Sequence, residues 1–375
     1  MTQRLSPAKR WATSGLTLAG VLAFTGCATK LGPQTVGPDR FNYNQSILDS
    51  ADEQMLLNLV RLRYRDRAMF LELQSVVSQR SLQARINGGA TVGVGGGSDN
   101  EYPIGGSLGF EEKPTVTYTP LQGEAFAERI LTPIAPETII LLSSSGWSIE
   151  RLFLTCVSRL NGIENAPTAT GPTPDEAPEF EEFQEVAGLL RLMQKSGMLR
   201  LQVYQRAGAA QPEVQVMLDV PTAGDGAETT EVARIRERLG LQPGRHQLRL
   251  SSALEPATEG EFAINPRSLM GIFFYLSQAV EPPPEHEAQG LVTVTRDAEG
   301  NRFDWTRVTG RLLRIHSSST RPKNAFTAVR YRDHWFYVED RDLDSKTTLN
   351  LLHFLFSLKS GGGKAVAPVL TLPAG

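Results

Sequence analysis

Two short stretches of this sequence resemble catalytic or phosphate-binding motifs, and each departs from its motif at a decisive position. Residues 146–150 read Gly-Trp-Ser-Ile-Glu and resemble a nucleophile elbow, which requires Gly at the last position. Ser148 is better explained as the cap of a helix. Residues 361–364 read Gly-Gly-Gly-Lys, but Ala365 stands where a phosphate-binding loop needs a hydroxyl. Neither stretch therefore supplies complete catalytic chemistry.

Three carboxylates at alternate positions, Asp340, Asp342 and Asp344, resemble the start of a calcium loop. Ser345 and Leu351 stand where that loop needs Gly and Glu, so we expect helix capping and local pairing instead, and a looser cation site is the alternative. No pair of histidines has the spacing of metal ligands on one helix, and we expect no metal and no cofactor. The histidines are His246, His286, His316, His334 and His353.

The cysteine most open to modification is Cys27. A start with three cations, an apolar run over residues 16–24 and the small pair Thr25-Gly26 precede it, which is the pattern of an export signal. With the cysteine in place, the stretch resembles a bacterial lipoprotein signal, although Phe24 stands where Leu is usual. The resemblance implies that Cys27 becomes the acylated first residue and carries palmitate. Ala28 follows instead of Asp, which in such proteins implies sorting to the outer membrane.

Length and charge bound the remaining options. The chain has 375 residues, and cleavage before Cys27 would leave 349, enough for about two domains. Loss of the three signal cations would move the formal net charge from -3 to -6, which argues against nucleic acid as a partner. The other cysteine, Cys156, lies in an apolar stretch, and we expect a buried, inert thiol without a disulfide. The run over 16–24 is too short to span a bilayer.

Hydrophobic periodicity predicts an α+β protein, with mixed helices and a mainly antiparallel sheet. We expect helices at 51–64, 121–131, 148–160, 179–196, 229–239, 265–279 and 345–358, with caps at Ser50 or Asp49, Ser148, Asn265 and Asp344. We expect strands at 70–81, 114–119, 198–205, 213–220, 245–251, 261–264, 291–296, 311–317, 326–332 and 334–339. Residues 138–142 form a short apolar element of uncertain type.

Composition divides the chain into five parts. They are a signal peptide at 1–26, a tether at 27–45, an N-terminal α+β domain at 46–163, a Pro-rich linker at 164–178 and a C-terminal α+β domain at 179–375. The apolar helix expected at 265–279 should be central to the second domain, because it is hydrophobic almost all round.

A Gly-rich hairpin at 83–110 is the most distinctive segment. Residues 83–94 alternate between apolar or small and polar types, 95–100 form a turn, and 102–110 alternate again. Each arm has about the 9–11 residues of a transmembrane strand, with Tyr102 and Phe110 at girdle positions. Insertion would require a ring of protomers, because open strand edges are not tolerated in lipid. Against insertion, the Gly, Ala and Val of the outward set bury little area. The interpretation we favour is a twisted, partly mobile hairpin on a periplasmic sheet, because Gly-rich strands are weakly specified in register.

Four arginines at alternate positions, Arg61, Arg63, Arg65 and Arg67, form a candidate contact for anionic headgroups or an acidic partner. The simpler interpretation is a set of cations at the end of a helix, paired locally with Asp66 and Glu72. We favour the simpler interpretation, because the set is small and a strand follows it.

Three blocks together resemble an uncharacterised family of bacterial envelope lipoproteins. They are residues 54–66, 114–123 and 335–346, which begin Gln-Met-Leu-Leu-Asn-Leu, Pro-Thr-Val-Thr-Tyr and Trp-Phe-Tyr-Val-Glu-Asp. The resemblance implies no activity, so no functional residue follows from it.

The sequence therefore favours a non-enzymatic binding or scaffolding protein, held by lipid at the outer membrane and facing the periplasm. Its expected partners are the membrane, through the lipid on Cys27, and envelope proteins or further copies of the chain. Two alternatives stay open: a protomer of an oligomeric outer-membrane pore that inserts hairpin 83–110, and an envelope hydrolase with an unrecognised site.

Overall fold

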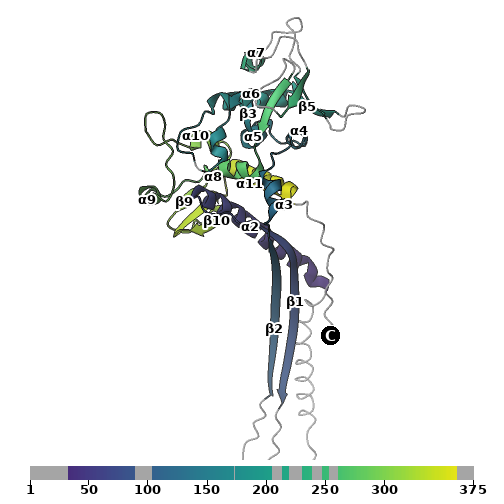
Figure 1. The fold of residues 1–375 in the computed structure, drawn as a ribbon. Coiled ribbons are helices and arrows are strands. Elements are labelled where there is room, and N and C mark those ends of the chain that lie inside the picture. Colours follow the sequence, from purple (N-terminus) through teal and green to yellow (C-terminus); the bar gives the residue numbers. More distant parts are fainter. Residues whose placement is uncertain are drawn as a thin grey trace, which may run out of the picture.

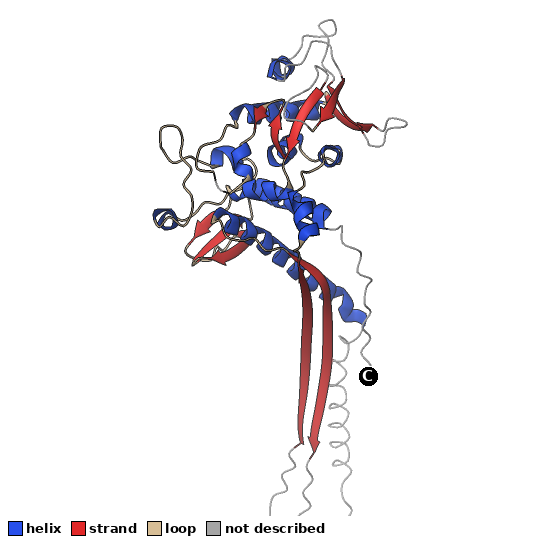
Figure 2. Ribbon diagram, in the orientation of Figure 1, coloured by secondary structure: helices blue, strands red, loops and turns tan. Residues whose placement is uncertain are grey.

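The computed structural model describes residues 33–88, 104–172, 174–204, 213–218, 230–238, 247–252 and 261–360. Within them the protein is α+β with mainly antiparallel sheets, which confirms the predicted class. Helices and two sheets form a body, and a two-stranded hairpin projects from it (Figure 1). Coloured by secondary structure, the hairpin is the long red pair that leaves the body (Figure 2).

The larger sheet of the body has the strand order β4-β3-β8-β7-β6-β5. Its neighbours are antiparallel except β7 and β8, which are parallel. The strands are β3 (Val157–Leu160), β4 (Ile163–Glu164), β5 (Leu199–Tyr204), β6 (Glu213–Leu218), β7 (Gln247–Ser251) and β8 (Glu261–Pro266). β3 pairs with β8 across the segment that the sequence assigned to a linker, so both sides of that segment share one sheet.

The smaller sheet has the order β10-β11-β9, with β9 at His316–Ser318, β10 at Ala325–Tyr331 and β11 at His334–Glu339. β10 and β11 form the predicted tight hairpin, in which Arg332 and Asp333 have φ of 47° and 64°. Left-handed values at both central residues match the right-handed twist of the flanking strands.

Helices pack around both sheets. They are α2 (Pro33–Arg63), α3 (Glu124–Leu131), α4 (Pro136–Ser144), α5 (Ile149–Cys156), the 3-10 helix η2 (Pro167–Thr170), α6 (Glu181–Ser196), α7 (Thr230–Arg238), α8 (Leu269–Ser277), α9 (Pro284–Ala288), α10 (Thr306–Thr309) and α11 (Leu343–Ser360). The predicted stripe of α6 is buried, from Phe180 to Met193, and α8 lies in the core as its composition predicts. None of the described helices combines the length and hydropathy needed to cross a bilayer.

Several predicted boundaries are wrong. α2 begins at Pro33, so most of the segment expected as a tether is helical. α5 ends at Cys156, and the residues that follow turn into β3. α8 is capped by Ser268 instead of Asn265, which lies in β8. Residues 291–296 form no strand, because their backbone makes only isolated bridges.

The segment 164–178 packs into the body instead of linking two parts through solvent. Asn165, Ala166 and Ala169 are fully buried, and the Asn165 amide donates to the carbonyls of Leu154 and Val157 at 2.9 and 2.7 Å. These bonds help to satisfy buried carbonyls where α5 ends and β3 begins. The prolines shape the path of the chain, and the polar side chains fix it.

Arg267 is the buried charge that joins α5, β3, η2 and α8. Its guanidinium donates to the carbonyls of Leu154, Thr155 and Val157 at 3.1, 3.2 and 2.7 Å, and to that of Asn165. It lies 4.0 Å from the centroid of the Tyr275 ring. Burial lowers the pKa of Arg267 to about 10. With backbone carbonyls and a ring as its partners, the charge is held by dipoles instead of a carboxylate.

Candidate functional site: the projecting hairpin and its base

The projecting hairpin consists of β1 (Leu71–Gly88) and β2 (Ile104–Pro120), an antiparallel pair that forms a sheet of its own. Its register runs from Leu71 opposite Pro120 to Gly88 opposite Ile104, with one irregularity between Leu73 and Ser75. At 3.3 Å or so per residue, β1 reaches about 60 Å. The described part therefore exceeds a hydrocarbon core, which is about 30 Å thick.

The register brings the apolar positions of the two arms opposite one another. Leu82 lies opposite Phe110, Ala84 opposite Leu108, Ile86 opposite Gly106 and Gly88 opposite Ile104. The intervening pairs are Gln83 with Gly109, Arg85 with Ser107 and Asn87 with Gly105. Because successive positions of a strand alternate between faces, the outer part of the hairpin has one apolar-type face and one polar or small face.

Charged residue types collect between this outer part and the body. Arg80 pairs with Glu112, Ser81 with Glu111 and Gln79 with Lys113. The hairpin thus changes in sequence character along its length, from a charged middle to an outer part without acidic residues among its described positions.

The base of the hairpin is fixed to the body by Asn58 of α2. The Asn58 amide donates to the Met69 carbonyl at 2.8 Å and accepts from the Met69 amide at 2.9 Å. Periodicity places Asn58 on the polar face of its helix, but the residue is 1% exposed. Next along the chain, Phe70 packs against the rings of Phe126, Phe273 and Phe356. Two hydrogen bonds between the Asn58 side chain and the Met69 backbone, together with a cluster of aromatic rings, therefore anchor the base of the hairpin.

The arginine set that the sequence offered as a surface contact does not act as a unit. Arg63 is 3% exposed and donates to the Thr293 carbonyl at 3.1 Å, so it cannot reach a headgroup or a partner. Burial lowers the pKa of Arg63 to about 10. Arg61 is half-buried, whereas Arg65 and Arg67 are exposed, with Arg65 3.7 Å from Asp175.

Asp66, which we expected to pair with these arginines, is hydrogen-bonded to residues of the smaller sheet. Asp66 accepts from Arg332 at 3.0 Å and from the Tyr331 hydroxyl, both at the far end of the β10–β11 hairpin. These hydrogen bonds, led by that of Tyr331, hold the pKa of Asp66 below its usual range. The carboxylate therefore ties the end of α2 to the smaller sheet.

The other predicted site residues are Cys27, Tyr102 and Phe110. Cys27 and Tyr102 lie outside the described residues, as do 89–103, which include the expected turn. Phe110 lies in β2 with its backbone opposite Leu82.

Two histidines that are distant in sequence meet beside the base. The ring centroids of His286 and His334 are 4.8 Å apart, the Tyr64 hydroxyl lies 2.7 Å from Nδ1 of His286, and Glu285 lies 2.9 Å from Nε2 of His334. Burial raises the pKa of Tyr64, so its hydroxyl stays protonated and shares a hydrogen bond with Nδ1 of His286. Such a phenol is a poor nucleophile, and the cluster is suited to holding α2, α9 and β11 together. No motif in the sequence links these three positions.

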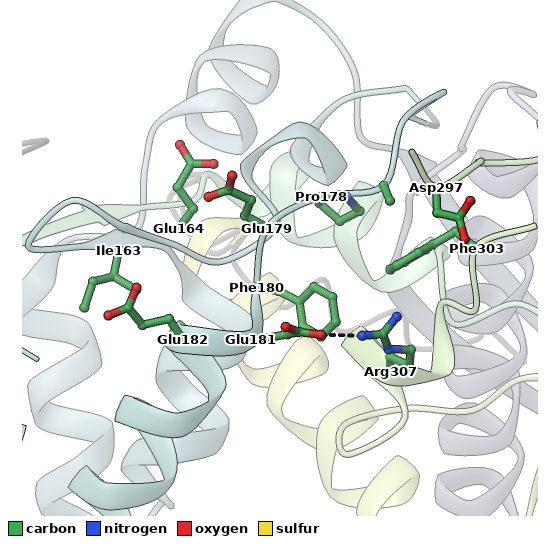
Figure 3. Close-up of a pocket in the computed structure, with 11 residues that line it drawn as sticks. Ile163, Glu164, Pro178, Glu179, Phe180, Glu181, Glu182, Asp297, Phe303 and Arg307 are labelled. Carbon is green, nitrogen blue, oxygen red and sulfur yellow. Dashed lines mark hydrogen bonds and ion pairs between the residues drawn. The ribbon is translucent and has the colours of Figure 1, made fainter. Parts of the chain in front are cut away.

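An acidic hollow of about 390 Å³ lies at the start of α6 (Figure 3). Glu181 forms an ion pair with Arg307, whose guanidinium also lies 5.5 Å from the Phe180 ring and 5.8 Å from that of Phe303. Carboxylates in the first turn complement the helix dipole. Ion pairing with Arg307 and the dipole of α6 thus account for Glu181.

The remaining candidates from the sequence have local partners. Ser148 caps α5 by accepting from the Arg151 amide, and Asp342, instead of Asp344, caps α11 through the Ser345 amide at 3.0 Å. Asp344 binds Arg151, and Asp340 binds Lys346 at 2.7 Å. Cys156 is buried as predicted, and burial raises its pKa to about 12. The described residues hold no cluster of three His, Cys, Asp or Glu that could bind a metal ion.

Comparison of the chain with protein-family models, curated proteins and solved structures gave no match.

Proposed function

We propose that this protein is a lipid-anchored envelope component that assembles through its hairpin, with the outer part of β1 and β2 entering the outer membrane beside the hairpins of other copies. The observation that carries the proposal is a ribbon about 60 Å long that leaves the body with both edges unpaired among the described strands. An isolated two-stranded ribbon is marginal in water, and open edges favour pairing with another chain.

Two further observations support the proposal. The outer pairs place apolar residue types on one face, and charged types lie between them and the body, which is the order expected of a segment that meets a membrane surface. The purple start of α2 lies on the side of the body from which the hairpin projects (Figure 1). A lipid on Cys27 would therefore be attached on the hairpin side.

The decisive test compares two double variants with the same charge change. Ala84→Lys with Leu108→Lys places two cations on the apolar face, and Gln83→Lys with Ser107→Lys places them on the other face. Wild-type protein extracted in mild detergent should migrate as a large species that heat dissociates. The first variant should lose that species, because charge on a lipid-facing strand position costs about 2–4 kcal/mol near the midplane. The second variant should retain it.

A wild-type protein that is monomeric in several detergents would refute the assembly. Equal behaviour of the two double variants would refute membrane contact by the apolar face. Unchanged melting of the body in both variants is the control that separates assembly from folding.

The lipid anchor has its own test. Cys27→Ser should abolish palmitate incorporation and increase the fraction released into the soluble periplasm, because stable anchoring depends on acyl chains. Absence of palmitate in the wild-type protein, in cells that label a control lipoprotein, would refute the anchor and leave the assembly to be judged by the first test.

A further inference from the structure

A groove of about 680 Å³ runs along α2 at the base of the hairpin. One wall is a single face of α2, from Ile47 through Leu57 to Arg61, and the others come from the start of β1, the end of β2 and the smaller sheet. Figure 1 shows these elements meeting where the hairpin leaves the body. The face from Ile47 to Arg61 is about 21 Å long at 1.5 Å per residue. The volume of the groove is thus within the size range of ligand pockets, and its lining extends along the helix.

Apolar side chains make up much of the lining, beside the polar residues Ser50, Gln54 and Asn58. Ile47, Leu57, Leu71, Leu73, Tyr118 and Trp335 contribute to it. Two of the large lining side chains are exposed: Tyr118 is 45% exposed and Met69 is 51% exposed. Large side chains that share an open groove at such exposure are typical of a binding surface.

The charges of the groove are of nearly one sign. Arg61, Arg321 and Arg330 line it, against Glu53 as the one acidic residue. Arg330 is balanced by Asp333 at 3.0 Å. Arg321 lies 5.2 Å from the centroid of the Trp335 ring. Arg61 lies near enough to the Asp66 carboxylate to help lower its pKa, but among the described residues neither guanidinium forms an ion pair within 4 Å. Two guanidinium groups therefore remain for an anionic group, which Arg binds strongly when it carries carboxylate or phosphate.

We infer that the groove binds an anionic lipid, with one acyl chain along the α2 face and the phosphate of the headgroup at Arg61 and Arg321. An acyl chain matches the apolar side chains along the α2 face, and the Asn58 amide beside them is already bonded to Met69. The uncompensated cations select the headgroup charge. The inference rests on α2, the base of the hairpin and the smaller sheet, and does not require the hairpin to enter a membrane.

The test uses the purified full chain carrying Cys27→Ser, so that no attached lipid competes. Lysophosphatidylglycerol is titrated below its micelle concentration, with lysophosphatidylcholine of the same chain length as the zwitterionic control, and native mass spectrometry reports the stoichiometry. We expect one anionic lipid per chain, bound at least tenfold more tightly than the zwitterionic one. Inorganic phosphate at millimolar concentration should fail to displace it, because the acyl chain supplies much of the affinity.

Matched variants locate the site. Arg61→Gln with Arg321→Gln should weaken binding of the anionic lipid tenfold or more, since the charge-assisted hydrogen bonds to its phosphate are lost. Arg311→Gln with Arg314→Gln removes the same charge from the segment between α10 and β9 and should leave binding unchanged. Trp335→Phe should abolish the change in tryptophan emission that lipid causes.

Equal affinity for the two lipids, equal loss in the two double variants, or displacement by phosphate alone would each overturn the inference. Absence of lipid binding by a folded wild-type chain would overturn it as well. Melting curves of all variants distinguish a lost site from a lost fold.

Discussion

The body and the hairpin of this protein hold their strands by opposite means. In the body, a strand such as β3 has neighbours on both sides, and buried polar groups of Asn165 and Arg267 satisfy the carbonyls around it. Among the described strands, β1 and β2 pair only with each other, and Asn58 and Phe70 fix the base of the hairpin. The contrast teaches that the body can be stable by itself, whereas the hairpin acquires stability from what it meets.

The largest expected effect comes from breaking the body at its buried charge. Arg267→Leu should lower the free energy of unfolding by about 3 kcal/mol or more, because the buried carbonyls of Thr155 and Asn165 lose their side-chain donor and the ring of Tyr275 loses its cation. Urea denaturation measures the change. Exposed Arg330→Leu is the control and should stay within about 0.5 kcal/mol. A loss below about 1 kcal/mol at Arg267 would show that other donors replace the guanidinium.

The joint between the two regions should come next. Asn58→Ala removes both side-chain bonds to the Met69 backbone and should cost about 1–3 kcal/mol. It should also speed amide hydrogen exchange at residues 69–73 more than in the body. Gln54→Ala, one turn earlier on α2, is the matched control. Uniform exchange in both variants would mean that the base is held by the aromatic cluster alone.

A smaller effect should separate two neighbouring arginines. Arg63→Leu should cost about 1–2 kcal/mol, because the Thr293 carbonyl loses its buried donor, whereas exposed Arg65→Leu should cost less than about 0.5 kcal/mol. Thermal unfolding of the pair measures the difference. The reverse order would restore a surface role for Arg63.

The smallest expected effect is a pH dependence of opposite sign at two histidines. Burial, followed by the charge of His334, lowers the pKa of His286, so its contribution is present above the unfolded pKa of about 6.5 and is lost as pH falls. A hydrogen bond to Glu281 raises the pKa of His316, so its contribution is present below that value and is lost as pH rises. Denaturation at pH 5.5 and 7.5 should therefore show His286→Gln less sensitive to acid than wild type and His316→Gln more sensitive. Equal pH profiles would contradict both assignments.

Local patterns predicted much of the fold where one face of one element decides the outcome. The apolar stripe of α6 and the turn at Arg332 and Asp333 are examples, because neighbours in sequence supply the signal. The start of α2 was missed because Gly37 and Pro38 count against a helix by propensity, a weak prior that tertiary context overrides.

The segment 164–178 and the base of the hairpin were missed for another reason. Proline content reports how a chain turns, and it says nothing of whether Asn165 finds two carbonyls to bond. Likewise, the helical pattern marks Asn58 and Arg63 only as polar residues. Their burial depends on the backbone of Met69 and of Thr293, to which they are hydrogen-bonded. The meeting of Tyr64 with His286 and His334 joins three distant segments, which spacing along the chain cannot encode.

The pairing of Val157 with Pro266 joins residues that are far apart in the sequence, and this limits how early the protein can fold. The buried face of α11, including Leu349 and Leu355, belongs to the same core as Leu56 and Leu59 near the other end. A chain that emerges N-terminus first therefore cannot complete its hydrophobic core until the residues around 355 have emerged. Such non-local topology slows folding and lengthens the time for which apolar segments are exposed to aggregation. Newly emerged chains should accordingly depend on chaperones until α11 packs against the core.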